Sequence, residues 1–82
     1  MRKRGDWMKP TDDQILEILG DSGLVLSPSI IAFNAGFTRT HVNNRLSEFA
    51  DKGLVDRVER GKYEISETGL GYLSGDVDAT EL

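Results

Sequence analysis

Apolar side chains recur at helical intervals in four stretches of the chain. The first stretch carries them on a single helical face, at Ile15, Leu16, Ile18 and Leu19. Thr11 precedes this face as a capping residue, two aspartates follow it in the first turn, and the glycine-rich residues 20–23 end it. The pattern predicts a first helix from about residue 11 to residue 20.

A second helix is predicted from Pro28 to about Asn34. Ser27 followed by proline is a typical helix start, with a capping side chain before a residue that suits the first helical position. Its three large apolar residues, Ile30, Ile31 and Phe33, are expected to face the core. Between the first two helices, Leu24 and Val25, with or without Leu26, form either a short strand or an extended link.

The third helix is the best defined. Residues 35–37 supply a tight turn, in which Gly36 can adopt a positive φ, and Thr38 caps a helix of residues 38–52 that stops at Gly53. Its apolar residues follow the spacing i, i+4, i+7, i+8 and make one narrow stripe: Val42, Leu46, Phe49 and Ala50.

A hairpin and a last helix complete the pattern. Leu54, Val55 and Val58 begin a strand, residues 60–62 make a turn, and residues 63–65 alternate as the second strand. Ser66 caps the last helix, whose apolar residues are Leu70, Tyr72 and Leu73. The acidic residues after Gly75 are expected to be disordered. The predicted organisation is an N-terminal arm (1–10), a domain (11–74) and a tail (75–82). The fold is mainly α with a small β-hairpin (α+β), in the order α-(β)-α-α-β-β-α.

Composition excludes several classes of function. The 82 residues suit one small domain, without cysteine and with His41 as the single histidine. Disulfides, thiolate metal sites, histidine-pair metal sites and thiol nucleophiles are therefore excluded, and we expect neither an enzyme nor a metal or cofactor. No apolar run approaches the about 20 residues of a membrane span, and no signal peptide follows the basic start. We expect a soluble cytoplasmic protein that does not bind membranes.

The net charge of −4 is unevenly distributed. Residues 1–10 carry a net +3 and residues 36–62 a net +2, whereas residues 11–35 carry −4 and residues 63–82 carry −5. Basic charge therefore lies in the arm and in the third helix with its hairpin, although an acidic protein can show such fluctuations without function. Asp exceeds Glu and Arg exceeds Lys, which hints at adaptation to salt.

The outward face of the third helix suits base edges in DNA. With the apolar stripe turned inward, the first two turns present Arg39, Thr40, His41, Asn43 and Asn44. Arginine can bridge guanine, asparagine can bridge adenine, and a threonine methyl can meet thymine. A solvated helix face is the alternative, but two consecutive asparagines are poor helix formers and favour a binding role.

Arg60 and Lys62 flank Gly61 at the hairpin tip and could reach phosphates. Basic residues at a hairpin edge can equally serve to prevent edge pairing. Without further context, neither interpretation is favoured over the other. Residues 2–4 resemble a minor-groove arm, although a disordered basic terminus is the simpler interpretation. Trp7 could stack on nucleic acid or anchor a partner, but the preferred interpretation is that it closes the edge of a small core.

The chain resembles the winged helix-turn-helix regulators of bacteria and archaea, and especially the archaeal halophage phi-H repressor type. The resemblance covers about residues 7–74 and rests on T38-x-T-H-V-x-N-R-L46, F49-x-x-x-G-L-V55 and R57-x-x-R-G-x-Y63-x-I-S-x-T-G69. It implies sequence-specific binding of duplex DNA, with helix 38–52 in the major groove and the hairpin of residues 56–65, the wing, on the backbone. By position, it implies base contacts from Arg39, Thr40, Asn43 and Asn44. It implies phosphate contacts from Thr38, His41, Arg45, Arg60 and Lys62.

We therefore expect a transcriptional regulator, in the simplest case a repressor, that acts as a homodimer. A winged-helix monomer buries only about 600–1,000 Å² on DNA, so a dimer would roughly double the contacts. Trp7, Leu70 and Tyr72 are the candidate interface residues. No small-molecule effector is expected, because no separate effector domain is present. The alternative function is a winged-helix adaptor that binds a protein partner instead of DNA.

Overall fold

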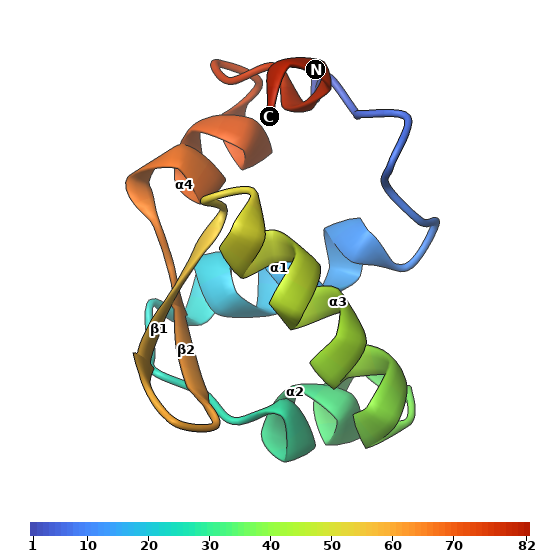
Figure 1. Cartoon of the computed structure of the whole chain (residues 1–82), viewed down its shortest axis with the longest axis vertical. Helices are drawn as coiled ribbons and strands as arrows, with labels where there is room; N and C mark the ends of the chain where they lie inside the picture. Colours follow the sequence, from blue (N-terminus) through green and yellow to red (C-terminus); the bar gives the residue numbers. More distant parts are fainter.

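Four α-helices and a two-stranded hairpin fold together in the order that the pattern predicts (Figure 1). The computed structural model describes all residues, 1–82. Its elements are α1 (Asp12–Ser22), α2 (Pro28–Ala35), α3 (Arg39–Asp51), β1 (Val55–Glu59), β2 (Lys62–Ile65), α4 (Glu67–Ser74) and a short 3-10 helix, η1 (Ala79–Glu81). No helix combines the length and the apolar character that a membrane crossing needs.

Side-chain caps begin three of the four α-helices. The hydroxyls of Ser27, Thr38 and Ser66 accept backbone N–H groups at the starts of α2, α3 and α4, which satisfies donors left free at a helix start. The prediction for Thr11 is wrong. Its backbone is already helical, with φ −83° and ψ −10°, and its hydroxyl makes no capping bond; it contacts α3 instead.

The core lies between α1, α3, the hairpin and α4. The predicted stripe of α3 is confirmed, since Val42, Leu46 and Phe49 are fully buried. They pack with the predicted inward residues of α1 and with Leu54 and Tyr63 from the hairpin region. Burial of this stripe fixes the rotation of α3, and therefore which of its side chains face outward.

The prediction for α2 is only partly right. Ile31 is fully buried, but Ile30 is 49% exposed and Phe33 is 88% exposed. Successive helical residues turn by about 100°, so Ile30 and Ile31 cannot both face the core. Pro28, Ile31 and Ala32 form the buried face, and Ile30 and Phe33, three residues apart, lie together on the opposite face.

The hairpin has the predicted position. Strands β1 and β2 pair antiparallel with Arg57 opposite Tyr63, and an irregularity follows between Arg57 and Glu59. The tip is Arg60-Gly61, where Gly61 has a φ of +74°. Only Leu26 of the expected link strand pairs with the hairpin, through two backbone hydrogen bonds to Tyr63 of 2.8 and 2.9 Å.

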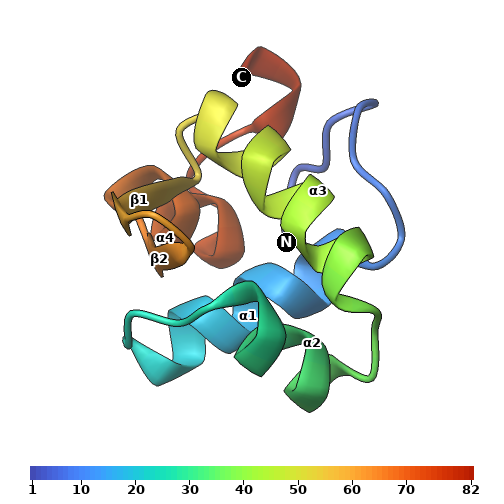
Figure 2. The same cartoon turned by 60° about the horizontal axis from the view of Figure 1, so that its bottom comes forward.

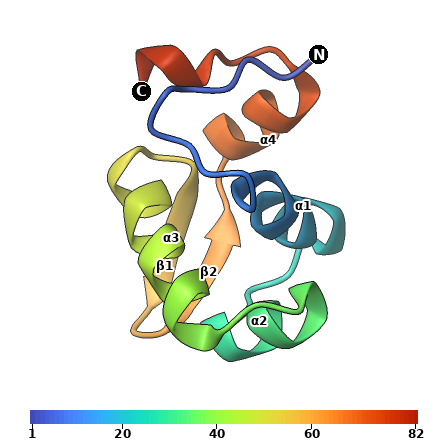
Figure 3. The ribbon, with the colours of Figure 1, turned by 90° about the vertical axis from the view of Figure 1, so that its right-hand side faces the viewer.

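The two termini pack together, so the predicted disorder of residues 75–82 is wrong (Figure 3). Lys3 pairs with Asp78 as an isolated parallel bridge, and the Ala79 N–H donates to the Lys3 carbonyl at 2.9 Å. Ala79 is fully buried, and Val77 and Leu82 pack against the core. Hydrogen bonds from Thr80 lower the pKa of Asp78. The tail was expected to be disordered because it is acidic, but its apolar residues pack against the core.

Gly69 of α4 provides a test of this packing. A Cβ there would collide with the Leu54 carbonyl and the Ile65 side chain. Alanine normally stabilises a helix relative to glycine by about 1 kcal/mol, but a backbone atom cannot move aside easily. We expect Gly69→Ala to lower the free energy of unfolding by about 1–3 kcal/mol, measured by urea denaturation.

Gly71→Ala in the same helix is the matched control. Its Cβ would meet Val77 Cγ2 at 2.6 Å, the end of a side chain that can shift. Its cost should be smaller. An equal or greater loss at Gly71 would contradict the role assigned to the Leu54 carbonyl.

Candidate nucleic-acid interface

The first two turns of α3 present an uninterrupted polar surface. Arg39, Thr40, Asn43 and Asn44 are all exposed. The buried stripe forces this orientation for Thr40, Asn43 and Asn44, which lie on the arc of the helix that Val42, Leu46 and Phe49 leave free. Arg39 lies two turns before Leu46 and is exposed because it is the first residue of the helix. The four predicted base contacts are therefore all accessible. The start of α3, which carries them, lies at the end of the molecule that holds α2 and the hairpin tip (Figures 1 and 2).

A polar cleft of about 630 Å³ joins this face to the hairpin. Its lining comes from the start of α2, the start of α3 and the hairpin tip: Ser27, Pro28, Ser29, Arg39, Thr40, Asn43, Arg60 and Gly61. The structure thus brings three predicted base contacts and one predicted phosphate contact together. Ser27 and Ser29 were not predicted as site residues. Their place beside Pro28 at a helix start is the signal that could have found them.

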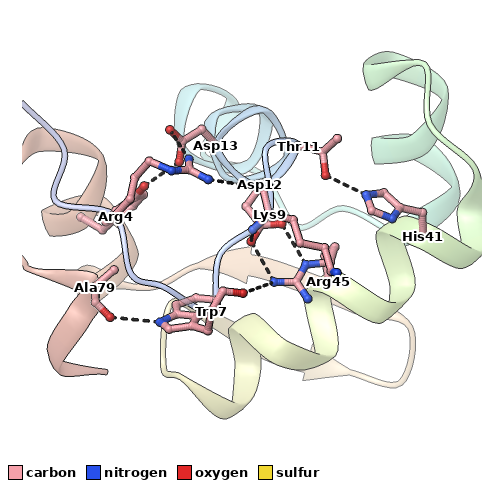
Figure 4. A network of polar contacts seen from close by, with 10 residues as sticks. Arg4, Trp7, Lys9, Thr11, Asp12, Asp13, His41, Arg45 and Ala79 are labelled. Carbon is pink, nitrogen blue, oxygen red and sulfur yellow. Dashed lines mark hydrogen bonds and ion pairs between the residues drawn. The ribbon is translucent and has the colours of Figure 1, made fainter.

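His41 points toward α1 rather than outward (Figure 4). Its Nε2 lies 2.7 Å from the Thr11 hydroxyl oxygen, and its ring packs edge-on against Phe37 with centroids 5.7 Å apart. This bond joins the first turn of α3 to the start of α1. His41 therefore has an internal partner. The phosphate contact that the resemblance implied for it gave no indication of this partner.

Arg45 is a correction to the predicted phosphate contacts. Its Nε and one terminal nitrogen each donate to the Asp12 carboxylate at 2.8 Å, and its side chain is only 9% exposed (Figure 4). Asp12 is fully buried and also accepts the Lys9 N–H at 2.9 Å. The hydrogen bonds with Asp12 raise the pKa of Arg45. Arg45 lies between Val42 and Phe49 on the inward face, so its charge is neutralised inside the protein.

The basic residues of the wing differ in their contacts within the molecule. Lys62 Nζ lies 3.0 Å from a Glu59 carboxylate oxygen, with both side chains more than half exposed, a pair that solvent weakens. Arg57 donates to the Tyr63 hydroxyl at 3.0 Å and lies over its ring. Arg60 is exposed at the tip, and no hydrogen bond or ion pair holds it. Thr38 is exposed too, but its hydroxyl oxygen caps α3.

Comparison with known proteins identifies the family. The family model described as "winged helix-turn-helix phage repressor" matches residues 1–82. The chain belongs to this phage repressor family. A repressor protein of Halobacterium phage phiH is 34% identical over 86 residues, which cover 100% of this chain and 97% of that relative. The predicted family is therefore confirmed.

A solved structure confirms the fold of this repressor-family chain. The crystal structure of the PhiH1 repressor-like protein from Haloarcula marismortui has a TM-score of 0.89 and 35% identity, and the match covers 99% of this chain and 93% of that chain. Family membership makes the protein a DNA-binding regulator of the repressor type. The excess of Asp over Glu and of Arg over Lys agrees with a relative from a Halobacterium phage.

Two of the three predicted dimer-interface residues have internal partners in this repressor fold. Tyr72 is fully buried and donates its hydroxyl proton to Asp13 at 2.6 Å. Burial and this hydrogen bond raise the pKa of Tyr72. Its assignment to an interface is wrong, because its ring belongs to the core. Leu70 remains available, at 47% exposure.

Trp7 closes the edge of the core, as one of its two interpretations predicted. Its ring meets Phe49 edge-on with centroids 6.2 Å apart, and its Nε1–H donates to the Ala79 carbonyl at 3.0 Å. Lys52 Nζ lies 5.2 Å from the centre of the same ring. The indole thus joins the arm, the tail and the end of α3.

The arginines of the arm are paired within the repressor fold. Arg2 lies 3.1 Å from a Glu17 carboxylate oxygen and donates to the Leu73 carbonyl at 3.0 Å. Arg4 lies 2.9 Å from Asp13. The arm is therefore neither a disordered terminus nor a free minor-groove arm in this structure, because the acids of α1 and the tail bind it.

Proposed function

We propose that the protein is a sequence-specific repressor that binds duplex DNA as a homodimer. In this proposal α3 enters the major groove and the wing lies along the backbone. One observation carries it: Thr40, Asn43 and Asn44 are exposed on one face and form no side-chain hydrogen bond within the molecule, and the first two border the hairpin tip through the polar cleft.

The chemistry of these side chains supports base recognition. Each asparagine offers a donor and an acceptor that match the major-groove edge of adenine, and the Thr40 methyl can contact thymine. They lie in the N-terminal half of the helix, which contacts bases in helix-turn-helix proteins. Asp51 lies in the last turn of α3, where the helix would leave the groove and an acid would not face phosphates.

A symmetric dimer suits so small a surface. One domain of this size contacts few base pairs, and two copies related by a two-fold axis would bind a palindrome with a fixed half-site spacing. Leu70, on the exposed side of α4, is the candidate contact that the structure leaves available. Helix α4 lies toward the opposite end of the molecule from α2 and the hairpin tip (Figure 1), so dimerisation through it would leave the cleft open.

Selection of bound sequences from a random duplex library tests this function. We expect a palindromic motif, and we expect Asn43→Ala or Asn44→Ala to weaken binding to it by about 10- to 100-fold per half-site, since one bidentate base contact contributes about 1–3 kcal/mol. The loss should be confined to one or two base positions. Affinity would be measured by fluorescence anisotropy with the selected duplex.

Gln14→Ala is the matched control. Gln14 is an exposed amide on α1, outside the cleft, and its removal should leave the affinity unchanged. Sequence-blind binding by the wild type, or equal affinities for all variants, would exclude base recognition by α3.

The adaptor function has one observation in its favour, the exposed apolar pair Ile30 and Phe33 on α2. Exposed apolar side chains of this size often mark protein contacts. The same library selection separates the two functions. An adaptor would show no salt-sensitive binding to any duplex and would lose its partner on Phe33→Ser.

A further inference from the structure

The cleft between α2, α3 and the hairpin tip is free of negative charge. None of its eight lining residues is acidic, although the chain carries 14 acids and a net charge of −4. Two arginines line it, Arg39 at the first position of α3 and Arg60 at the hairpin tip. Hydroxyl groups of Ser27, Ser29 and Thr40 and the amide of Asn43 supply the rest of its polar lining.

These two arginines are also the ones without partners. Four of the six arginines are bound inside the molecule, to carboxylates, a carbonyl or a tyrosine hydroxyl: Arg2, Arg4, Arg45 and Arg57. Arg39 and Arg60 form neither an ion pair nor a side-chain hydrogen bond, and both are exposed. The protein thus neutralises its other guanidinium groups and leaves two unpaired at a single cleft. Two cations that line one cleft repel each other, so an anion between them would stabilise the arrangement.

We propose that this cleft binds one phosphate group of the DNA backbone between Arg39 and Arg60. A guanidinium can donate two parallel hydrogen bonds to phosphate oxygens, and one phosphate has oxygens for donors from two sides. The inference rests on the proposed DNA-binding function and deepens it. It assigns Arg39 to the backbone, whereas the sequence resemblance implied a base contact.

The shared phosphate would set the position of α3 along the groove. Thr40 and Asn43 line the same cleft as the two arginines, so a phosphate bound there fixes where these side chains lie relative to the bases. The first turn of α3 and the hairpin tip would then hold the same point on one strand. Phosphate contacts of this kind determine register without reading sequence themselves.

Removal of single phosphate charges from the selected duplex tests the proposal. Methylphosphonate would replace each phosphate in turn, symmetrically in both half-sites, and affinity would be measured for the wild type, Arg39→Ala, Arg60→Ala and the double variant. We expect each single variant to lose about 10- to 100-fold per half-site, as for a hydrogen bond to a charged group. The double variant should lose clearly less than the product, because both residues bind one phosphate.

The decisive result is a single phosphate position per half-site. Neutralising that phosphate should weaken the wild type strongly, each single arginine variant less, and the double variant little. Lys3→Ala is the control, since it removes the same charge at the opposite end of the molecule, beside Asp78. It should leave binding nearly unchanged. Circular dichroism melting should show that the variants, changed at exposed positions, fold normally.

Three results would overturn the proposal. Additive losses, with a different sensitive phosphate for each arginine, would reject the shared phosphate and leave the DNA-binding function standing. Sequence-blind or absent duplex binding by the wild type would reject both. Saturable binding of inorganic phosphate, seen by NMR titration, together with unchanged duplex affinity in both variants, would show a site for a free anion instead of DNA.

Discussion

Replacement of Asp12 by alanine is expected to lower the free energy of unfolding by about 3–5 kcal/mol. The carboxylate is fully buried and accepts three hydrogen bonds, two from Arg45 at 2.8 Å and one from the Lys9 N–H at 2.9 Å. Its loss leaves a guanidinium that is mostly shielded from water without an opposite charge. Since small domains have about 5–15 kcal/mol of stability in total, urea denaturation should show a large shift of the midpoint.

Two controls separate the buried pair from an ordinary ion pair. Glu17→Ala removes a carboxylate that lies 3.1 Å from Arg2 and is 41% exposed, and it should cost at most about 1 kcal/mol. The double change Asp12→Leu with Arg45→Met leaves no unpaired charge, so it should cost less than Asp12→Ala alone. A loss below about 1 kcal/mol for Asp12→Ala would show that desolvation cancels the attraction of the pair.

The pair also determines how α3 is presented. It joins α3 to the start of α1, and Arg45 also lies 3.5 Å from the Trp7 carbonyl (Figure 4). Asn44, the preceding residue, is exposed on the predicted recognition face. Together with the bond between His41 and Thr11, the pair holds the first two turns of α3 against α1. Two residues that the resemblance suggested for phosphate contact thus hold the helix that carries the predicted base contacts.

Local signals in the sequence were sufficient for α3 and the hairpin. A capping threonine, a single apolar stripe and a glycine stop define α3, and Arg60-Gly61 marks the tip between alternating strands. Each of these signals depends on residues at most four positions apart, so it can be recognised from the sequence alone. The exposure of Thr40, Asn43 and Asn44 followed from the same stripe.

The errors concern contacts between distant parts of the chain. Arg45 lies three residues after Val42 and four before Phe49, on the buried stripe, and this position could have suggested an inward role. Its partner Asp12 is 33 residues away, and no spacing rule connects the two. The prediction for the tail failed for a similar reason, since Ala79 accepts a hydrogen bond from Trp7, 72 residues earlier. Composition alone predicted disorder there.

A second large effect concerns salt: we expect the affinity for the selected duplex to fall only about 100- to 200-fold between 50 and 200 mM salt. For a protein that neutralises Z phosphates, log K falls against log salt with a slope of about −0.9Z. Of the six basic residues in 36–62, Arg45, Arg57 and Lys52 are bound internally. The shared phosphate and one contact from Lys62 leave about two phosphates per copy, hence a slope of about −3.6 for a dimer.

The slope also reports the number of copies on the DNA. A monomer with the same contacts would give about half that slope, and Arg39→Ala with Arg60→Ala should reduce the dimer's slope by about 2, one phosphate in each half-site. Anisotropy titrations at four salt concentrations would measure it. A slope of about −8 or steeper would mean more phosphate contacts than these residues supply. Arg57, Lys52 or the arm arginines would then have to leave their present partners when DNA binds. A slope near the expected value of about −3.6 would instead support a repressor in which one cleft and one lysine of each copy make the phosphate contacts.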